Sequence, residues 1–416
     1  ILDKPYDSEF EARITSKSNG QIGPGASYSL SKRNALRRAE KVTWKVRGSY
    51  EWQTGARPED VSSSIINSYE LGTSLQMDFP RLVLPGTRAF NSRYTGTTTF
   101  KLDASWLNRA GYFGMVEFSG EATYTMQRTR FSKHTLTPIK LKYVSLLSTT
   151  AEFDAVASRN QALFVSMRDQ LVPSMEYTYA LTSSQRARHP GTLSVTAKEA
   201  GNLLSGIYAA GGRSFKTIDK RLLGVPFAQY LKLTVDMRKE VKFTQRQSLV
   251  GHLAVGAVWT YGNSRVAPYS DLFAVGGANS IRAFCLRGIG PGRYNPRGSN
   301  YSYLDQMGDL KLEANLEYRF PVLPSLYGAA FIDCGNVWLM RPDSDRPGGA
   351  ISARHFARDL ALGTGVGLRY DLEFLVIRFD LGVGIHAPYD TGRPGYYNMP
   401  RFSRSLGYHF AIGYPF

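Results

Sequence analysis

The chain has 416 residues, with 51 Lys and Arg against 34 Asp and Glu, which gives a formal net charge of +17. Its mean hydropathy of −0.27 is typical of soluble proteins, and its length fits several soluble domains or one very large one. No run approaches the roughly 18 apolar residues that a membrane-spanning helix needs. Two Cys exclude a disulfide framework and a cysteine-rich zinc site. The first residues lack a basic stretch before an apolar core, so we predict no signal peptide.

Alternation of apolar and polar residues with period two is the dominant pattern along the chain. Lipid-facing and lumen-facing residues alternate in a transmembrane β-barrel, so its mean hydropathy stays low. The pattern is clear at 42–53 and clearest near the C-terminal end, at 310–320, 360–370 and 375–386. It predicts sixteen strands, at 8–18, 24–33, 41–54, 65–79, 97–108, 114–129, 135–148, 174–184, 190–199, 227–241, 248–262, 309–320, 326–339, 360–372, 374–387 and 405–416.

The connections and the tryptophans favour a membrane barrel over a soluble fold. Links after odd-numbered segments are mostly long and those after even-numbered segments mostly short, as in outer-membrane barrels. All five Trp fall at the apolar positions of their alternating segments, which we call apolar parity. Four of them lie where an aromatic girdle is expected, namely Trp52, Trp106, Trp259 and Trp338. A soluble β-sandwich or propeller would also alternate, but it accounts for neither feature. We predict an all-β fold in which residues 1–416 form one 16-stranded antiparallel transmembrane β-barrel.

The longest connection, 263–308, lies between the eleventh and twelfth predicted strands. Long ordered loops in compact folds are usually functional. It contains Gly276-Gly277 and then Ile281-Arg282-Ala283-Phe284, without the strand–loop–helix context of a phosphate loop. The sequence resembles the barrel domain of the BamA/TamA superfamily of outer-membrane insertases, with TamA-like and BamA-like members of Bacteroidetes-type bacteria nearest in character. That family carries a GG…(V/I)RG(F/Y) motif in this loop, which folds back into the lumen. Ala283 stands where the family has Gly.

Two further family motifs follow in the same order. The family's LE(F/Y) strand corresponds to Leu316-Glu317-Tyr318, and its F-x-D-x-G-x-V-W strand to the segment with Phe331, Asp333 and Gly335. Glu317 and Asp333 fall on the polar parity of adjacent strands, and two confined carboxylates repel unless a cation lies between them. An Arg can hold both through forked hydrogen bonds, and in the family the motif Arg is held in this way. The alternative is that these residues and Arg282 are ordinary charged lining of the lumen.

The resemblance implies outer-membrane protein assembly through a weakly paired lateral seam between the first and last strands. An exposed strand edge is a template for pairing with another chain. We assign to this seam Phe10, Ala12 and Ile14 in the first segment, and Gly413, Pro415 and Phe416 in the last. Pro cannot donate to a strand ladder and Gly permits a kink. The alternative is that Gly and Pro simply end a strand.

The implied partners are unfolded outer-membrane β-barrel substrates, the lipid bilayer, lipopolysaccharide, and periplasmic or lipoprotein accessory subunits, in the bacterial outer membrane. Family members carry POTRA domains before the barrel, and we predict none in this chain. The sequence predicts no cofactor, metal, catalytic residue or nucleic-acid partner, because G-x-S-x-G and H-E-x-x-H are absent and the six His lack ligand spacing. We therefore expect no enzyme. The competing functions are a two-partner-type protein secretion pore and a passive porin.

Overall fold

Sixteen strands form one sheet in which each strand lies beside the next in chain order. The order is β1-β2-β3-β4-β5-β6-β7-β8-β9-β12-β13-β14-β15-β16-β17-β18, and a separate two-stranded hairpin pairs β10 with β11. In the computed structural model the described residues are 5–16, 21–53, 68–83, 94, 96–109, 113–151, 154, 169–184, 187–218, 220–285, 287–295, 306–372 and 375–416. All sixteen segments predicted from alternation correspond to strands of this sheet, which is the expected all-β architecture.

The strand bounds follow the alternating segments closely. The strands of the large sheet are β1 (Tyr6–Ser16), β2 (Gln21–Arg33), β3 (Lys41–Gln53), β4 (Ser68–Phe79), β5 (Gly96–Arg109), β6 (Phe113–Gln127), β7 (Ser132–Thr149), β8 (Gln170–Thr182), β9 (Gly191–Ala200), β12 (Tyr230–Lys242), β13 (Ser248–Thr260), β14 (Leu310–Leu323), β15 (Leu326–Trp338), β16 (Ala361–Asp371), β17 (Val376–His386) and β18 (Leu406–Ile412). The connections hold the hairpin β10 (Arg221–Leu222) and β11 (Val225–Pro226), helices α3 (Asn202–Ala210) and α5 (Phe356–Asp359), and the single turns η2 (Tyr269–Asp271) and η3 (Phe402–Ser405).

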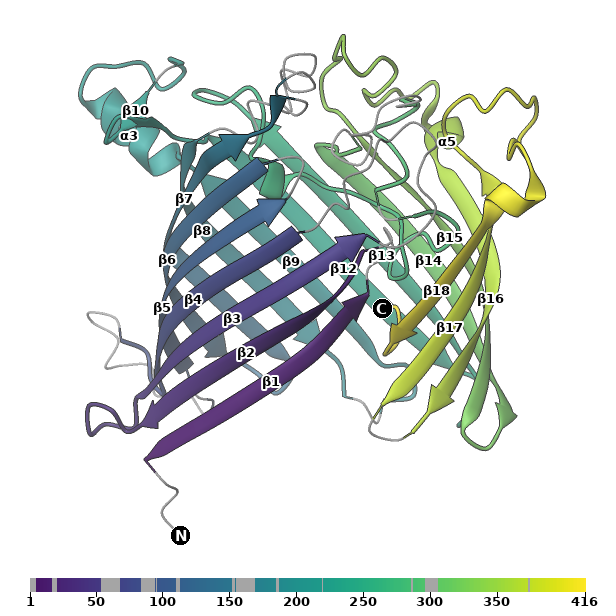
Figure 1. Cartoon of the computed structure of the whole chain (residues 1–416), viewed down its shortest axis with the longest axis horizontal. Helices are drawn as coiled ribbons and strands as arrows, with labels where there is room; N and C mark the ends of the chain where they lie inside the picture. Colours follow the sequence, from purple (N-terminus) through teal and green to yellow (C-terminus); the bar gives the residue numbers. More distant parts are fainter. Residues whose placement is uncertain are drawn as a thin grey trace. The chain divides into compact units, whose positions relative to one another are not determined.

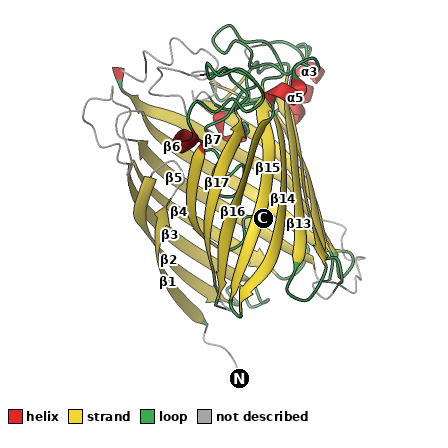
Figure 2. Ribbon diagram, turned by 90° about the vertical axis from the view of Figure 1, so that its right-hand side faces the viewer, coloured by secondary structure: helices red, strands yellow, loops and turns green. Residues whose placement is uncertain are grey.

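The chain divides into two compact units. Unit 1 comprises Ile1–Ala180, Thr196–Leu231 and Thr260–Tyr269, and unit 2 comprises Leu181–Val195, Lys232–Trp259 and Ser270–Phe416. In unit 1 the strands β1 to β7 run side by side, from purple to blue in Figure 1. In unit 2 the strands β14 to β17 lie next to one another (Figure 2), β18 pairs with β17, and α5 lies in the connection at the end of β15.

The distribution of polar and apolar residues in unit 2 is the reverse of that in a water-soluble sheet. On β14 the buried parity is polar, with Glu317 fully buried, while Leu316 beside it is 46% exposed. On β17 Asp380 is fully buried, while Phe379 is 46% exposed. A soluble sandwich would bury its apolar face, so this inversion excludes that alternative for these strands and gives them an apolar outer surface.

Three sequence-based predictions differ from the structure. The last strand was expected over 405–416, but β18 ends at Ile412 because Gly413 adopts φ +86° and turns the chain out of the ladder. Trp338 was expected in an outer girdle, but it is 1% exposed, stacked on Phe356 of α5. The link at 200–226 was expected as a loop, but it contains helix α3.

Candidate functional site

The connection between β13 and β14 spans residues 261–309, and its residues 273–284 lie against the polar face of unit 2. A bridge between Phe273 and Gly308 holds its two ends together. Its central turn uses positive φ angles at Gly276 (+100°) and Gly277 (+93°), which Gly adopts without steric cost. The turn is closed by hydrogen bonds from Gly277 N to Phe284 O (2.8 Å) and from Phe284 N to Ile281 O (3.1 Å). This turn presents residues 281–284 to the strands.

Arg282 lies at the tip of this turn and contacts both carboxylates predicted for it. Its Nε and Nη2 donate to Asp333 Oδ2 and Oδ1, each at 2.8 Å, and its backbone N donates to Asp333 Oδ2 at 3.0 Å. Its Nη1 donates to Glu317 Oε2. All three residues are fully buried, so the forked geometry supplies the hydrogen bonds that a buried ion pair needs to offset desolvation.

The surroundings of Arg282 keep its guanidinium charged. Burial alone disfavours the charged form, but hydrogen bonds and charges from Asp333 and Glu317 outweigh this effect and raise the pKa of Arg282. Its Cζ also lies 3.5 Å from the centre of the Phe331 ring, close enough for a cation–π contact. Phe331, from the predicted strand motif, therefore lies directly against the motif Arg.

Arg282, Glu317 and Asp333 belong to a larger group of buried charged residues, which we call the Arg282 cluster. Arg319 Nε lies 2.8 Å from Glu317 Oε1, and Arg369 bridges Glu317 Oε2 (3.0 Å) and Asp380 Oδ1 (2.6 Å). Arg378 lies 3.4 Å from Asp380 and donates from Nη2 to Asn279 Oδ1 of the connection at 2.6 Å. Arg319, Arg369, Arg378 and Asp380 lie at polar positions of their strands, and the sequence shows this alternation. The sequence does not show that they lie close together, because alternation within a strand says nothing about contacts between distant strands.

Glycines on β16, β17 and β18 form a floor beneath the backbone of the connection. A Cβ at Gly382 would lie 2.5 Å from Arg282 O, and one at Gly407 would lie 2.6 Å from the same oxygen. A Cβ at Gly363 would lie 2.4 Å from Ala283 Cβ. We call Gly363, Gly382 and Gly407 the glycine floor. Side chains there would lift the connection away from the sheet.

Ala283, the departure from the family motif, is accommodated by this floor. It is 7% exposed and is not among the described residues with positive φ, so its Cβ causes no backbone strain. The space for that Cβ is provided by Gly363. Ala therefore fits where the family has Gly, because the residue opposite it on β16 is Gly363.

The apolar side chains beside Arg282 anchor the connection in a small core. Ile281 (0% exposed) and Phe284 (8% exposed) pack in one buried cluster with Val275, Ile289, Val337, Ala361, Ala387 and Met399. Gly335, the other residue of the strand motif, makes room for this cluster, because a Cβ there would lie 3.2 Å from Ile281 Cδ1 and 2.4 Å from Leu312 O. Burial of these side chains stabilises the connection independently of its charges.

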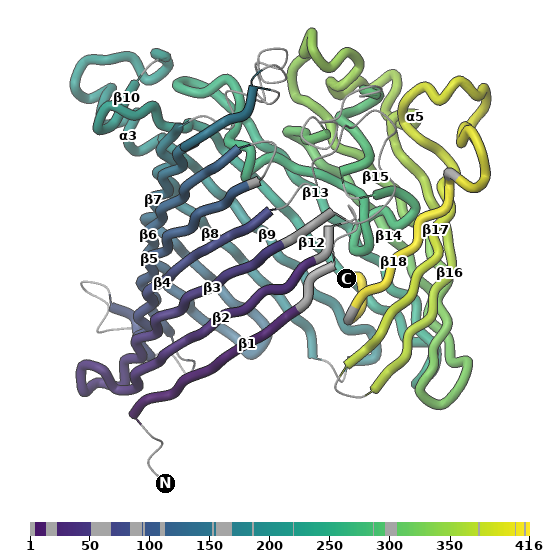
Figure 3. Tube along the Cα trace, in the orientation of Figure 1, coloured from purple at the N-terminus to yellow at the C-terminus, as the bar shows by residue number. Residues whose placement is uncertain are grey.

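The last strand contacts the connection directly. His409 Nε2 on β18 donates to Arg282 O at 2.7 Å. After Gly413 the chain turns toward β13, where the Phe416 ring stacks on His252 with centroids 5.1 Å apart and planes at 9°; Figure 3 follows this trace to the C-terminus. Tyr414 lies against Arg319, whose Cζ is 4.2 Å from its ring centre. Regular alternation continued from β18 would place Phe416 on the apolar face, but the kink at Gly413 brings it to the polar face.

The residues predicted for a lateral seam are divided between unit 1, which holds Phe10, Ala12 and Ile14, and unit 2, which holds Gly413, Pro415 and Phe416. Phe10 is 70% exposed on β1, where it is opposite Tyr28 of β2. Ala12 is opposite Ala26, and Ile14 is opposite Pro24, although the side chain of Ile14 lies outside the described residues. Gly413, Pro415 and Phe416 lie beyond the end of β18, and Gly413 N still donates to Val376 O of β17 at 2.8 Å.

Within the described residues, no group of three or more His, Cys, Asp and Glu is placed to hold a metal ion. The helices in that same part of the chain are all too short or too polar to cross a bilayer.

Comparison with known proteins decides the family. The model of the Omp85 superfamily domain matches residues 207–416, which contain the connection, the Arg282 cluster and the strands around it. The chain belongs to the Omp85 superfamily. The resemblance to a superfamily of outer-membrane insertases seen in the sequence is thereby confirmed, and with it the bacterial outer membrane as the location of the protein.

Solved structures resemble the chain over nearly its whole length. BamA from Haemophilus ducreyi lacking POTRA domains 1–3 aligns with a TM-score of 0.61 at 11% identity, covering 99% of this chain and 71% of that one. CdiB from Escherichia coli aligns at 0.47 and 15%, covering 99% and 63%. CdiB from Acinetobacter baumannii aligns at 0.48 and 11%, covering 98% and 59%. Curated proteins yield no significant match.

Membership of the superfamily assigns the chain a general role in inserting proteins into the outer membrane or transporting them across it. At these identities the likeness to the solved structures shows the fold alone, and the chain spans less than two thirds of either CdiB chain.

Proposed function

We propose that this chain assembles other outer-membrane β-barrel proteins, which pair with its own strand edges at a lateral seam between β1 and β18. The sixteen strands would close into one barrel, and the 261–309 connection would occupy its lumen. The observation that carries this proposal is the hydrogen bond from His409 on β18 to the backbone of Arg282. It joins the last strand to the buried ion pairs that Arg282 makes with β14 and β15.

The last strand has the properties of an edge that can exchange partners. β18 has 7 residues, whereas β17 beside it has 11, and the kink at Gly413 removes the following residues from the ladder. β18 ends the sheet order on one side, and β1 ends it on the other. Edge strands carry unpaired N–H and C=O groups that recruit a further strand, so both edges are suited to template a substrate strand.

The Arg282 cluster would act in this mechanism as a fixed support. The connection binds β14 and β15 through Glu317 and Asp333, and β18 through Arg282 O. Separating β18 from the connection would break one neutral hydrogen bond and leave the charge-assisted bonds to β14 and β15 intact. A neutral hydrogen bond contributes about 1 kcal/mol net and one to a charged group about twice that, so the connection holds β18 less firmly than it holds β14 and β15.

The partners of the seam would be unfolded outer-membrane β-barrel proteins, together with the bilayer, lipopolysaccharide, and periplasmic or lipoprotein accessory subunits. We propose no chemistry of bond making or breaking, and no cofactor, because strand exchange requires only hydrogen-bond pairing and burial of apolar side chains in lipid.

A reversible crosslink tests the proposal. In a background with Cys285 and Cys334 changed to Ser, single Cys on β1 are paired with single Cys on β18, and the pairs that form disulfides are kept. The protein is reconstituted in vesicles, and folding of a urea-denatured outer-membrane barrel is followed by its heat-modifiable migration on gels. We expect the oxidised pairs to fold the substrate more slowly than the reduced ones, with full recovery after reductant.

Equal rates in the oxidised and reduced states would refute the seam. Conductance across a planar bilayer separates the two alternatives: a passive porin would give a large steady pore and no acceleration of folding. A two-partner-type secretion pore would accelerate passage of a secreted chain and not insertion of a barrel.

A further inference from the structure

Helix α3 has its polar and apolar sides reversed relative to a helix of a soluble protein. On the side facing the protein, Asn202 Nδ2 donates to Tyr261 OH at 2.8 Å, and Ser205 Oγ donates to Gln229 Oε1 at 2.8 Å. Ser205 is fully buried. On the other side, Leu203 is 73% exposed and Ile207 60% exposed. A surface helix normally buries its apolar stripe and exposes its polar one.

The position of the helix is fixed by its first turn. Gly201 has φ +72°, and a Cβ there would lie 2.3 Å from Ala228 O, so only Gly fits at this junction. Gly201 N donates to Pro173 O of β8 at 2.8 Å, and Asn202 N donates to Glu199 Oε2 at 3.2 Å. The carboxylate at the helix N-terminus satisfies a backbone N–H that has no partner within the helix. The outward direction of Leu203 and Ile207 is therefore built into the fold.

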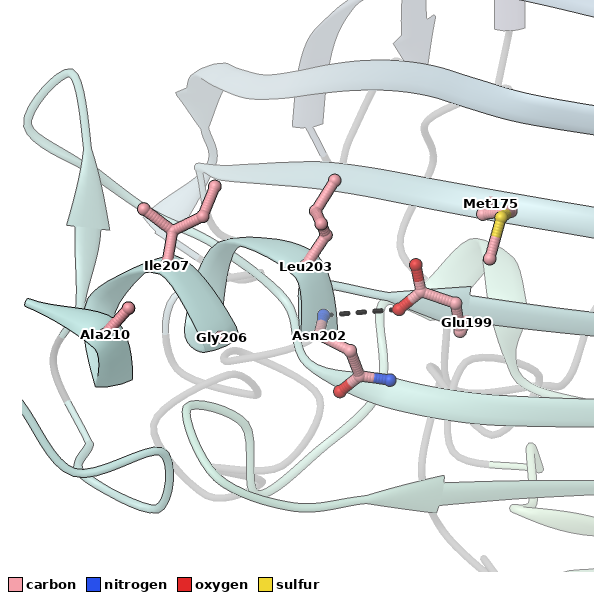
Figure 4. Close-up of a pocket in the computed structure, with 7 residues that line it drawn as sticks. All are labelled: Met175, Glu199, Asn202, Leu203, Gly206, Ile207 and Ala210. Atoms are coloured by element: carbon pink, nitrogen blue, oxygen red, sulfur yellow. Dashed lines mark hydrogen bonds between the residues drawn. The ribbon is translucent and has the colours of Figure 1, made fainter.

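The apolar side of α3 and strand β8 together line an open groove. Its lining is Met175 of β8, Glu199 of β9, and Asn202, Leu203, Gly206, Ile207 and Ala210 of α3. Figure 4 shows Leu203 and Ile207 projecting from the helix on the side of the strand that carries Met175. Met175 (43% exposed) continues along β8 into Tyr177 (40% exposed), so the groove opens onto the apolar outer face of the strand.

We propose that α3 is an interfacial helix whose groove holds an acyl chain of a phosphorylated lipid of the bilayer. Exposed apolar surface that continues the apolar outer face of a membrane strand fits hydrocarbon and not water. The segment that follows the helix is basic, and its Arg213, Lys216 and Arg221 are exposed. Cationic side chains beside an interfacial apolar surface attract anionic headgroups. The lipid that matches both features carries acyl chains and phosphate groups, as a lipid A does.

Spin-label accessibility tests this proposal. Nitroxides are placed at Leu203→Cys and Ile207→Cys in a background with Cys285 and Cys334 changed to Ser. Thr217→Cys, exposed in the basic segment, is the matched control. The protein is studied in vesicles of phosphatidylcholine alone and in the same vesicles containing lipid A. We expect labels at 203 and 207 to collide readily with dissolved oxygen and several-fold less often with an aqueous nickel reagent than the label at 217.

The charge part of the proposal has its own variants. We expect lipid A to move the labels at 203 and 207 deeper, and R213Q/K216Q to abolish this shift. R128Q/R130Q, which removes the same charge from the exposed turn after β6, should retain it. Labels at 203 and 207 that collide with nickel as often as the label at 217 would overturn the proposal. Shielding from both reagents would also overturn it, since a protein would then cover the helix, and so would a depth independent of lipid A.

Discussion

His409 on β18 donates a hydrogen bond from Nε2 to the backbone oxygen of Arg282, 2.7 Å away. The imidazole thus contacts the peptide group of the residue whose side chain holds Asp333 and Glu317. One residue links three strands, because its guanidinium engages β14 and β15 while its carbonyl engages β18. A change at Arg282 therefore affects both the anchor and the last strand, which makes it the most informative position to test.

Replacing Arg282 should loosen the whole connection. Arg282→Ala leaves Asp333 buried without its guanidinium partner, while Glu317 keeps Arg319 and Arg369, and removing one partner of a buried ion pair costs about 3–5 kcal/mol. Arg282→Lys keeps the charge but loses the fork, so we expect an intermediate effect. The readouts are the temperature at which the folded band disappears on gels and the rate of trypsin cleavage within 261–309.

Arg265→Ala provides the control for this prediction, because Arg265 is exposed on the same connection and exposed substitutions usually change stability by less than about 0.5 kcal/mol. If Arg282→Ala melts and is cleaved like Arg265→Ala, the anchor has no stabilising role.

The glycine floor should be intolerant of a single methyl group. Gly382→Ala would bring a Cβ within 2.5 Å of Arg282 O, and overpacking of this kind costs about 1–3 kcal/mol. Gly251→Ala on β13 is a matched control, since its Cβ would have Leu316 Cδ1 as nearest neighbour at 4.0 Å. We expect a lower melting temperature for Gly382→Ala and an unchanged one for Gly251→Ala. A similar fall in both would show that strand propensity, not contact with the connection, sets the cost.

The space between residues 283 and 363 should hold one Cβ, on either residue, but not two. Gly363→Ala places two Cβ atoms about 2.4 Å apart, which forces the connection off the sheet. Ala283→Gly removes one of them, so the double variant A283G/G363A should recover most of the stability and trypsin resistance lost in Gly363→Ala. A double-mutant cycle measures the coupling. Additive losses would mean that Gly363 is required for another reason.

Gly413 should control where residues 414–416 lie. Gly413→Ala meets no atom within 4 Å, but its φ of +86° is unfavourable for Ala by about 1–2 kcal/mol. Relief of that strain would straighten the chain and separate Phe416 from His252. We expect faster hydrogen–deuterium exchange at 413–416 and a changed rate of substrate folding in vesicles.

Gly395→Ala controls for the strain itself, because Gly395 has φ +97° and also has open space around it but lies in the 388–404 connection. Unchanged exchange at 413–416 in Gly413→Ala would show that contacts of Phe416 hold the kink without help from Gly413.

Alternation in the sequence predicted the strands well because each strand has one apolar face and one polar face, and this property is local. Even the segment predicted at 190–199 is a strand, β9 (Gly191–Ala200), and its polar positions hold Thr, Ser and Lys. Helix α3 was missed, although Leu203, Ile207 and Ala210 have helical spacing. The polar side of α3 faces the protein and its apolar side is exposed, and the sequence alone does not show which side of a helix faces the protein.

The candidate site was only partly accessible from sequence. Arg282, Glu317 and Asp333 were grouped by a family resemblance, whereas Arg369, Arg378 and Asp380 carry no motif and join them only through strand register. Trp338 was assigned to a girdle by parity, but α5 covers it and Asp359 accepts its indole N–H at 3.3 Å. A connection that covers the end of a strand buries residues there without changing the alternation of the sequence. Alternation therefore predicts exposure least well at the ends of strands.

The hydrogen bond between His409 and Arg282 joins residues 127 positions apart, and this separation bears on how the chain itself folds. Contacts this distant in sequence form late because the loop they close is long. We expect the turn at 276–284 to settle on β14 and β15 before β18 bonds to it, since the partner of His409 on that turn is a backbone oxygen. If β16 to β18 packed first, Asp333 would be left without the guanidinium that both its oxygens contact. The expected order of folding is therefore the 276–284 turn first and the contact with β18 last.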